Sequence, residues 1–375
     1  MRVEPAVPPE RLAAIRAPLE AAGAQSVDAP LLQPLNLLLD LAGEAMRARL
    51  FVVQSEGGTE SCLRPDFTVA IARQHIDSRR PEGRYLYEGP AFRASAGADR
   101  PEEFVQVGLE VFAPAGISET EDPEIASLAW RAAAAGGRDD LSLWLGDVAL
   151  FGAFVDSLEL PPSLAARLRR VAGRPRLLAA ELARVGETQA TGGGTLAGLL
   201  AGLSGSQSAA LLEEVWSLAG VAPVGGRSPA EIAARLIRKA EAANAPALTE
   251  AQAAAIRAFM AIDDAPQSAF DRVRALAGSN DAALTAALAA WDTRLASLAR
   301  SLPARSLRFT PALGHAFDYY DGITFEVRSA ALGAERPVAV GGRYDGLLAR
   351  LGGAADASAL GCMVRPWRAW AGGAA

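Results

Sequence analysis

The sequence predicts an α+β fold in which an antiparallel sheet is flanked by helices and interrupted by a helical insertion. Three observations support this prediction. Strand-like segments fill about 50 to 147, alanine- and leucine-rich segments with helical spacing fill about 161 to 304, and strands return after 305. Regular helices of about 10 to 15 residues do not separate the strands, which disfavours a doubly wound parallel sheet. We therefore expect a discontinuous core, over 1–155 and 305–375, and a helical insertion over 156–304.

The individual strands are recognised by branched or aromatic residues that alternate between turn signals. We expect six or seven strands in one sheet, drawn from the segments 49–54, 84–93, 103–112, 141–147, 306–310, 323–329, 337–340 and 359–364. In the helical middle, Ser163 and Thr249 are predicted to cap helix starts, because a hydroxyl there can accept a hydrogen bond from a free N–H group. Gln252, three residues after Thr249, completes a predicted capping box.

The composition disfavours several classes of protein. Half of the 375 residues are hydrophobic and 21% are charged, which is typical of a packed chain rather than a disordered one. The formal charge of −6 disfavours nucleic acid as the main partner, because phosphate binding needs a basic surface. No apolar signal segment stands in the first 20 residues, and the longest alanine-leucine run, 282–291, is shorter than the roughly 20 residues that span a bilayer. We expect a soluble cytoplasmic protein.

Cysteine and histidine are too rare for several kinds of site. The two cysteines, Cys62 and Cys362, lie far apart in the sequence, so neither a disulfide framework nor a thiolate metal site is expected. The two histidines, His75 and His315, exclude an HExxH zinc site and histidine-rich clusters. No metal and no cofactor are predicted.

The segment 103–112 is the most informative strand. Alternation places one face at Val105, Val107, Leu109 and Val111, and the other at Phe104, Gln106, Gly108, Glu110 and Phe112. Gly108 leaves room for something to lie on the sheet between an amide and a carboxylate. A buried Glu110 would need a cationic or hydrogen-bonding partner. The alternative interpretation is a surface strand with two ordinary polar side chains.

Two further clusters frame this strand in the sequence. Asp66 and Thr68 stand at a strand-to-helix junction, where both can present oxygens outward; the alternative is a simple N-cap for a helix near Val69. The glycine turn 341–346 follows an apolar strand and permits close backbone approach, although such turns are weakly specific.

Taken together in their order along the chain, these clusters resemble the catalytic core of histidyl-tRNA synthetase. The segment 87–93 is similar to motif 2 of class II synthetases, and 318–326 with the glycine turn is similar to the two histidine-specific signatures. The resemblance covers about 30–155 and 305–368, and it implies a class II synthetase-like fold. The segments that support it are 63–68, 87–93, 104–110, 318–320 and 340–345.

Four departures from the synthetase pattern indicate a relative without its chemistry. The sequence ends at Ala375, just after the third motif, so we expect no anticodon-binding domain. His315 stands where the synthetase has the arginine that stabilises charge during adenylate formation. Arg365 and Trp367 replace the glycine and glutamate under the ATP and are expected to obstruct the adenine site, although Trp367 can also be an ordinary core aromatic. Motif 2 lacks the acidic residue that normally follows its arginine.

A chain that keeps the amino-acid pocket and loses the adenylation machinery resembles the family of ATP phosphoribosyltransferase regulatory subunits (HisZ). The resemblance implies a non-catalytic partner of the short catalytic subunit (HisG), as a homodimer within a hetero-oligomer. Such a subunit is required for the first step of histidine biosynthesis and lets L-histidine inhibit it. Two alternatives are a truncated synthetase-like enzyme that activates or transfers histidine, and an assembly scaffold with a vestigial pocket.

The resemblance also implies the residues of a histidine pocket. They are Asp66, Thr68, Arg93, Gln106, Glu110, His315, Tyr319, Tyr320 and Tyr344. The ligand's ammonium is expected at Asp66 and Thr68, with Gln106 assisting. Its imidazole is expected between Glu110 and Tyr320, and its carboxylate at Arg93 and His315.

A leucine-rich stretch suggests an interface between subunits. Class II cores pair through their first motif, which falls here at about 35–54, where one short helix contains Leu37, Leu38, Leu39 and Leu41. Because adjacent leucines cannot all face one small core, we expect another subunit to cover part of this helix. The alternative is a helix buried on all sides within the monomer.

Overall fold

The computed structural model describes residues 1–58, 60–95, 97, 100–114, 121–172, 175–183, 185, 207–208, 210–211, 214, 248–277, 281–311, 313 and 319–373. The chain divides into two compact units, of which the first comprises Met1–Ala153 with Phe259–Ala375 and the second comprises Phe154–Ala258. Within the described ranges, no helix is long and apolar enough to cross a lipid bilayer.

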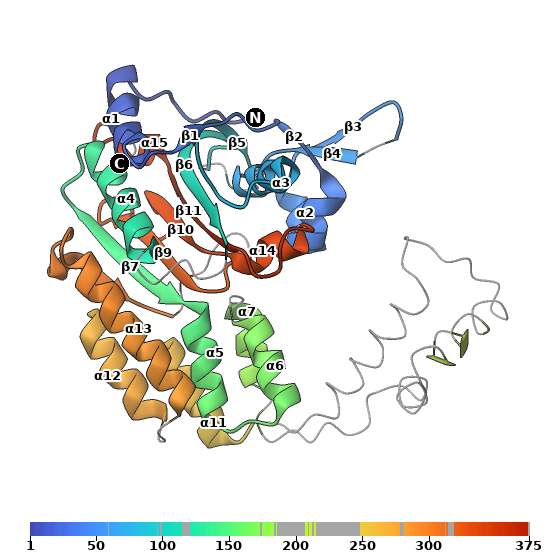
Figure 1. Ribbon diagram of the computed structural model, residues 1–375, viewed down its shortest axis with the longest axis vertical. Coiled ribbons are helices and arrows are strands. Elements are labelled where there is room, and N and C mark those ends of the chain that lie inside the picture. The colour runs from blue at the N-terminus through green and yellow to red at the C-terminus, as the bar shows by residue number, and fades with distance from the viewer. Residues whose placement is uncertain are drawn as a thin grey trace. The chain divides into compact units, whose positions relative to one another are not determined.

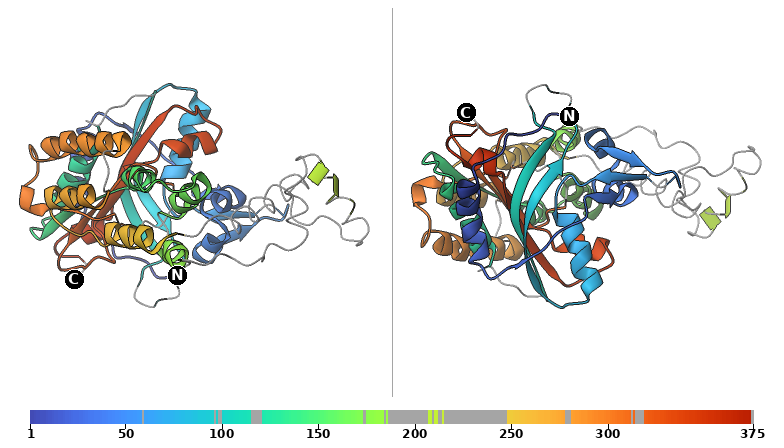
Figure 2. Two further views of the ribbon diagram at one scale, coloured as in Figure 1. Left: turned by 90° about the horizontal axis from the view of Figure 1, so that it is seen from below. Right: turned by 90° about the horizontal axis from the view of Figure 1, so that it is seen from above.

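The first unit is built on an eight-stranded sheet (Figures 1 and 2). Its strands lie in the order β1 (Gln25–Ser26), β5 (Gly83–Phe92), β6 (Glu103–Ala113), β11 (Ser358–Val364), β10 (Ala339–Arg343), β9 (Ile323–Ser329), β7 (Leu141–Asp147) and β8 (Leu307–Phe309). The six central strands pair antiparallel, as predicted. The edge strands β1 and β8 pair parallel with their neighbours, so the whole sheet is mixed. A two-residue strand such as β1 has no alternation by which to predict it.

A smaller antiparallel sheet stands in the same unit, with strands in the order β2 (Leu32–Pro34), β4 (Glu60–Leu63) and β3 (Val52–Gln54). Between β2 and β3 lie helix α2 (Leu35–Ala42) and the 3-10 helix η1 (Glu44–Arg49). The predicted strand 49–54 is thus shorter than expected, because its first residue ends η1.

The leucines of α2 are buried within the chain itself. Leu38, Leu39 and Leu41 are at most 9% exposed, and Leu37 packs against the same apolar cluster. That cluster also contains residues of α3 (Thr68–Ser78) and α14 (Asp345–Arg350), which lie close to α2 (Figure 1). The crowded leucines do not by themselves require a second subunit, because residues of α3 and α14 share in covering them, although Leu37 is only partly buried. The homodimer itself stays a prediction.

Helices cover the large sheet within the first unit. α4 (Glu121–Ala135) packs on β9, β10 and β11, and it contacts α1 (Pro9–Glu20), α13 (Ala282–Leu298) and α15 (Pro366–Ala369). The rings of Phe270 in α12 (Pro266–Ala277) and Trp291 in α13 lie 4.9 and 5.5 Å from that of Phe309 in β8. Residues 259–304 therefore belong to the same unit as the sheet, whereas the sequence predicts them as part of the helical insertion over 156–304. The reason is that helical spacing identifies a helix but not the surface on which it packs. That the insertion forms a separate domain stays a prediction.

The second unit contains α6 (Pro162–Val171), α7 (Pro175–Leu182) and most of α11 (Glu250–Met260), while α5 (Val148–Ser157) includes the residues at which the two units divide. The capping box before α11 is confirmed, because the Thr249 and Gln252 N–H groups each donate to the other's side chain, at 3.1 and 3.2 Å. The prediction of Ser163 as a cap is wrong. Pro161 stands at that position, and α6 begins with a second proline, whose fixed φ suits a first turn.

Candidate functional site

A cavity of about 960 Å³ lies on the large sheet, lined in part by residues of β5, β6, β9, β10 and β11. Eight of the nine residues predicted for a ligand pocket line it, namely Asp66, Thr68, Arg93, Gln106, Glu110, Tyr319, Tyr320 and Tyr344. The ninth, His315, lies outside the described residues. Residues from both ends of the chain therefore meet at one site.

Glu110 is the most enclosed acid of the cavity, with 1% of its surface exposed. Its Oε1 accepts a hydrogen bond from Thr68 Oγ1 at 2.7 Å, and its Oε2 accepts one from the Tyr344 hydroxyl. Burial raises the pKa of Glu110 to about 8, although these two hydrogen bonds oppose the shift. The sequence predicts a cationic or hydrogen-bonding partner for Glu110, and the structure shows two hydroxyl groups in that role. The Glu110 carboxyl can therefore hold a proton near neutral pH.

Gly361 makes room for Glu110. The two residues lie opposite each other on β11 and β6, and a Cβ at residue 361 would lie 1.8 Å from Glu110 Oε2. Gly108 is predicted to leave room for a ligand on the sheet, but the structure shows a protein side chain in that space. A Cβ there would lie 2.2 Å from the hydroxyl oxygen of Tyr87 on β5, so this space is taken by a side chain and not by a ligand. The surface-strand interpretation of β6 is wrong, because Gln106 and Glu110 are both buried.

Asp66 presents a second buried carboxyl, 7% exposed, just before α3. Burial raises its pKa to about 6, while the charge of Arg93 and nearby N–H and hydroxyl groups act in the opposite direction. Neither of its oxygens accepts a hydrogen bond of good geometry from the described residues. Phe67, not Asp66, occupies the N-cap position of α3 and makes no side-chain capping hydrogen bond, although the N–H groups of Thr68 and Val69 lower the pKa of Asp66.

The amide of Gln106 is also buried, with no exposed surface, and neither its nitrogen nor its oxygen has a hydrogen-bond partner among the described residues. A buried polar group without a partner costs roughly 1 to 3 kcal/mol. Gln106 and Asp66 both line the cavity. The site therefore offers an acceptor-only carboxylate and an amide, both of which a ligand could satisfy.

Three tyrosines form the aromatic side of the cavity. The ring centroid of Tyr319 lies 4.9 Å from that of Tyr320 and 5.6 Å from that of Tyr344. Burial raises the pKa of all three phenols, so they remain hydrogen-bond donors. The glycine turn makes room for the ring of Tyr320, because a Cβ at Gly342 would lie 2.8 Å from a carbon of that ring. Sequence reasoning missed Tyr87, which is fully buried and lowers the pKa of Glu110 as a further hydrogen-bond partner.

Arg365 fills another part of the cavity wall. It is 4% exposed, and its guanidinium lies 3.6 Å from the ring centroid of Phe104. Its Nη2 donates to Glu4 Oε1 at 2.5 Å, an acid that sequence reasoning also missed because no motif connects it to the site. One face of Phe104 is therefore covered. Trp367 lines the cavity and packs edge to face against Trp370, with centroids 5.5 Å apart.

The chain is similar to proteins of one family in sequence and in fold. The histidyl-tRNA synthetase family model matches residues 10–221 and 215–366. An ATP phosphoribosyltransferase regulatory subunit from Brucella anthropi is 33% identical over 355 residues, 93% of each chain. One from Mesorhizobium japonicum is 36% identical over 342 residues, 88% of this chain and 89% of the relative.

Solved structures of lower identity show the same fold. An ATP phosphoribosyltransferase regulatory subunit/histidyl-tRNA synthetase from Bacillus halodurans matches with a TM-score of 0.64 and 19% identity, over 95% of this chain and 76% of that one. A histidine–tRNA ligase subunit from Alicyclobacillus acidocaldarius matches with a TM-score of 0.55 and 22% identity, over 99% and 98%. The predicted class II synthetase-like α+β fold is confirmed.

Proposed function

The chain belongs to the family of ATP phosphoribosyltransferase regulatory subunits, and from this premise we propose that it is a non-catalytic, histidine-sensing subunit of that enzyme. In this proposal it works in the cytoplasm, bound to a separate short catalytic subunit that performs the first step of histidine biosynthesis. It is required for the activity of that subunit and lets L-histidine inhibit it. Within the complex, the chain pairs with a second copy of itself.

The pairing of two buried carboxyls, Asp66 and Glu110, with an arginine in one cavity is the observation on which the proposed ligand rests. An amino-acid zwitterion presents an ammonium to Asp66, where Thr68 and Gln106 add oxygens, and a carboxylate to Arg93. A ring with two nitrogens then reaches Glu110 and the tyrosine hydroxyls. An apolar ring of the same size would leave those groups unpaired, so the site selects imidazole.

The space beside Phe104 supports a subunit without adenylation chemistry. Arg365 is buried against the Phe104 ring and is paired with Glu4, so a large side chain fills this part of the cavity. Adenylate formation also needs preorganised cations around the developing phosphorane charge. A buried arginine that is already paired with a carboxylate is less available for that purpose.

Inhibition by histidine requires that the bound ligand favours one arrangement of the complex over another. Such a coupling free energy is typically about 1 to 3 kcal/mol, and it acts in both directions. The active arrangement of the catalytic subunit should therefore weaken histidine binding by the same factor by which histidine disfavours that arrangement.

Co-expression with the short catalytic subunit tests the proposal. We expect the two chains to co-elute on sizing, the catalytic subunit to be active only in the complex, and L-histidine to inhibit that activity. A catalytic subunit that is equally active alone would contradict the activating role. A complex that L-phenylalanine inhibits as well as L-histidine would contradict the sensing role.

A further inference from the structure

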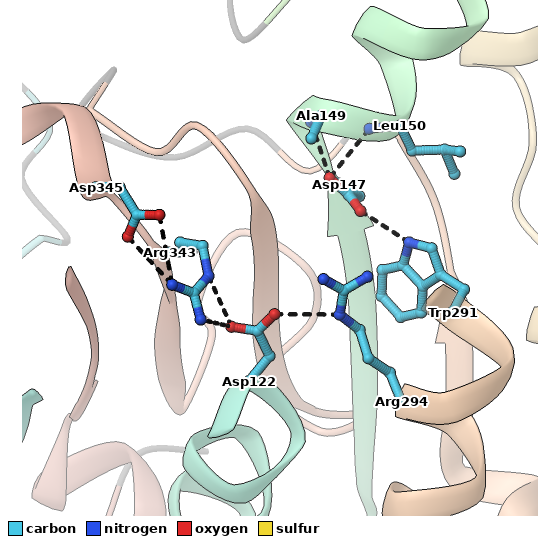
Figure 3. Close-up of polar contacts among 8 residues, drawn as sticks. All are labelled: Asp122, Asp147, Ala149, Leu150, Trp291, Arg294, Arg343 and Asp345. Atoms are coloured by element: carbon cyan, nitrogen blue, oxygen red, sulfur yellow. Dashed lines mark hydrogen bonds and ion pairs between the residues drawn. The ribbon is translucent and has the colours of Figure 1, made fainter. Parts of the chain in front are cut away.

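A polar cluster lies beside the tyrosine side of the cavity and is centred on Asp122, in the first turn of α4 (Figure 3). Asp122 is 1% exposed. Its Oδ1 accepts hydrogen bonds from Arg343 Nε and Nη2 at 3.0 and 2.7 Å, and its Oδ2 accepts one from Arg294 Nε at 3.1 Å. One carboxylate thus joins an arginine of β10 to an arginine of α13.

Arg343 and Asp345 stand on either side of Tyr344 in the sequence and pair with each other. Arg343 Nη1 donates to both Asp345 oxygens, at 3.2 and 3.4 Å, and Asp345 Oδ1 accepts the Ala359 N–H at 2.7 Å. Arg343, the last residue of β10, reaches α4, whereas Tyr344, at the N-cap of α14, reaches Glu110 in the cavity.

The segment that carries Tyr320 is tied to the same place. Asp321 accepts hydrogen bonds from the N–H groups of Asp345 and Gly346, at 3.1 and 2.6 Å. Its own N–H donates to the carbonyl of Arg343 at 3.1 Å. The two segments that bring tyrosines to the cavity therefore share one set of contacts.

The cluster continues on its other side through Arg294. Its guanidinium lies 5.4 Å from the ring centroid of Trp291. Trp291 Nε1 donates to Asp147 Oδ2 at 2.8 Å, and Asp147 Oδ1 accepts the N–H groups of Ala149 and Leu150 at the start of α5. Polar contacts and one ring contact thus form a continuous route from Arg343, the residue before Tyr344, to the first turn of α5 (Figure 3).

We propose that Asp122 and Arg343 are positioning residues of the ligand pocket: their ion pair sets where Tyr344 presents its hydroxyl to Glu110. The ligand named in the binding test rests on the proposed function, whereas the positioning itself does not. Loss of the Asp122 charge would leave two arginines near each other without their shared anion, which is costly when the groups are buried. Arg343 would then move toward Asp345, and the residue between them would move with it.

A spectroscopic test needs no ligand. The chain has five tyrosines, so labelling with 3-fluorotyrosine gives five fluorine resonances that single tyrosine-to-phenylalanine variants can assign. We expect Asp122→Asn to shift the resonance of Tyr344 and to leave that of Tyr85 in place. The control is Glu124→Gln on the same helix, which removes only an exposed ion pair with Arg84 and should shift neither.

A binding test measures the consequence for L-histidine by calorimetry. We expect Asp122→Asn to weaken binding about 10-fold in the otherwise unchanged chain and not at all in a Tyr344→Phe background, because the effect acts through that hydroxyl. If Asp122→Asn does not fold, Arg343→Lys is used instead, because lysine keeps the positive charge but cannot make the two guanidinium hydrogen bonds to Asp122.

Two results would overturn the proposal. One is a folded variant, with the melting temperature of the Glu124→Gln control, whose Tyr344 resonance has not moved. The other is an equal loss of histidine binding with and without the Tyr344 hydroxyl. A shifted Tyr344 resonance in a chain that binds no histidine would support the positioning role while contradicting the proposed ligand.

Discussion

The guanidinium of Arg365 lies against the ring of Phe104, and the buried carboxylate of Glu4 holds it there. Burial lowers the pKa of Arg365 to about 9, and the neighbouring Arg368 acts in the same direction, whereas Glu4 opposes both. The arginine nevertheless remains charged at neutral pH, so the ion pair persists. A buried and paired arginine therefore fills this part of the cavity.

We predict no histidine-dependent exchange of pyrophosphate into ATP. The large side chains of Arg365 and Trp367 line the cavity, and the resemblance to the synthetase implies that they stand where ATP would bind. The measurement is isotope exchange with the purified chain, with Glu110→Ala as the background. Exchange clearly above that background would reverse the assignment in favour of a synthetase-like enzyme.

We predict that Glu110→Ala weakens L-histidine binding by roughly 2 to 4 kcal/mol, because a buried hydrogen bond to the ring is lost and the ring nitrogen is left without a partner. Calorimetry on the isolated chain measures this. A matched control is Glu326→Gln, which changes another acid of the same cavity that is paired with Arg328 and should have little effect. Equal affinity of the wild-type chain for histidine and phenylalanine would contradict the pocket.

The stability of the chain should fall as the pH rises from about 5 to 8. Burial raises the pKa of Glu110 from its ordinary 4.5 to about 8, so in this window the folded chain holds a proton that the unfolded chain releases. The stabilising contribution is complete below pH 4.5 and is lost as the pH approaches 8. Glu110→Gln should flatten this part of the profile in denaturant unfolding, whereas Glu124→Gln should leave it unchanged. Parallel wild-type and Glu110→Gln profiles would show that another group causes the slope.

In the reconstituted complex, Glu110→Ala should leave catalysis in place and abolish or strongly weaken inhibition by histidine. The reason is that the mutation removes the ligand's differential affinity for the two arrangements without touching the catalytic chain. The measurement is a histidine titration of enzyme activity beside the wild-type complex. A mutant complex that remained fully inhibitable would place the sensing site elsewhere.

The strand 103–112 shows how far the sequence predicts this site. Alternation places Gln106 and Glu110 on one face of the strand, because the period is a local property of the chain, and packing in the folded chain then buries both residues. The pairing of Tyr87 with Gly108 depends on the neighbouring strand, so the residues of one strand alone cannot predict it. The same holds for Asp122 and Arg294, which are far apart in the sequence and meet only because α4 packs on α13. The leucines of α2 do not by themselves indicate an interface, because adjacent helical positions can face different neighbours within one chain.

The contact between Gly361 and Glu110 also restricts how this pocket can change in evolution. A methyl group at residue 361 would lie 1.8 Å from Glu110 Oε2, so residue 361 cannot gain a side chain while Glu110 stays in place. Gly108 and Tyr87 form a second pair of the same kind. Relatives in which either glycine is replaced should therefore have a different partner side chain and a shifted backbone, because a Cβ at residue 361 would lie 2.7 Å from the Leu109 carbonyl oxygen and one at residue 108 would lie 2.4 Å from that of Cys362. Such paired replacements would mark members of the family that have given up this ligand.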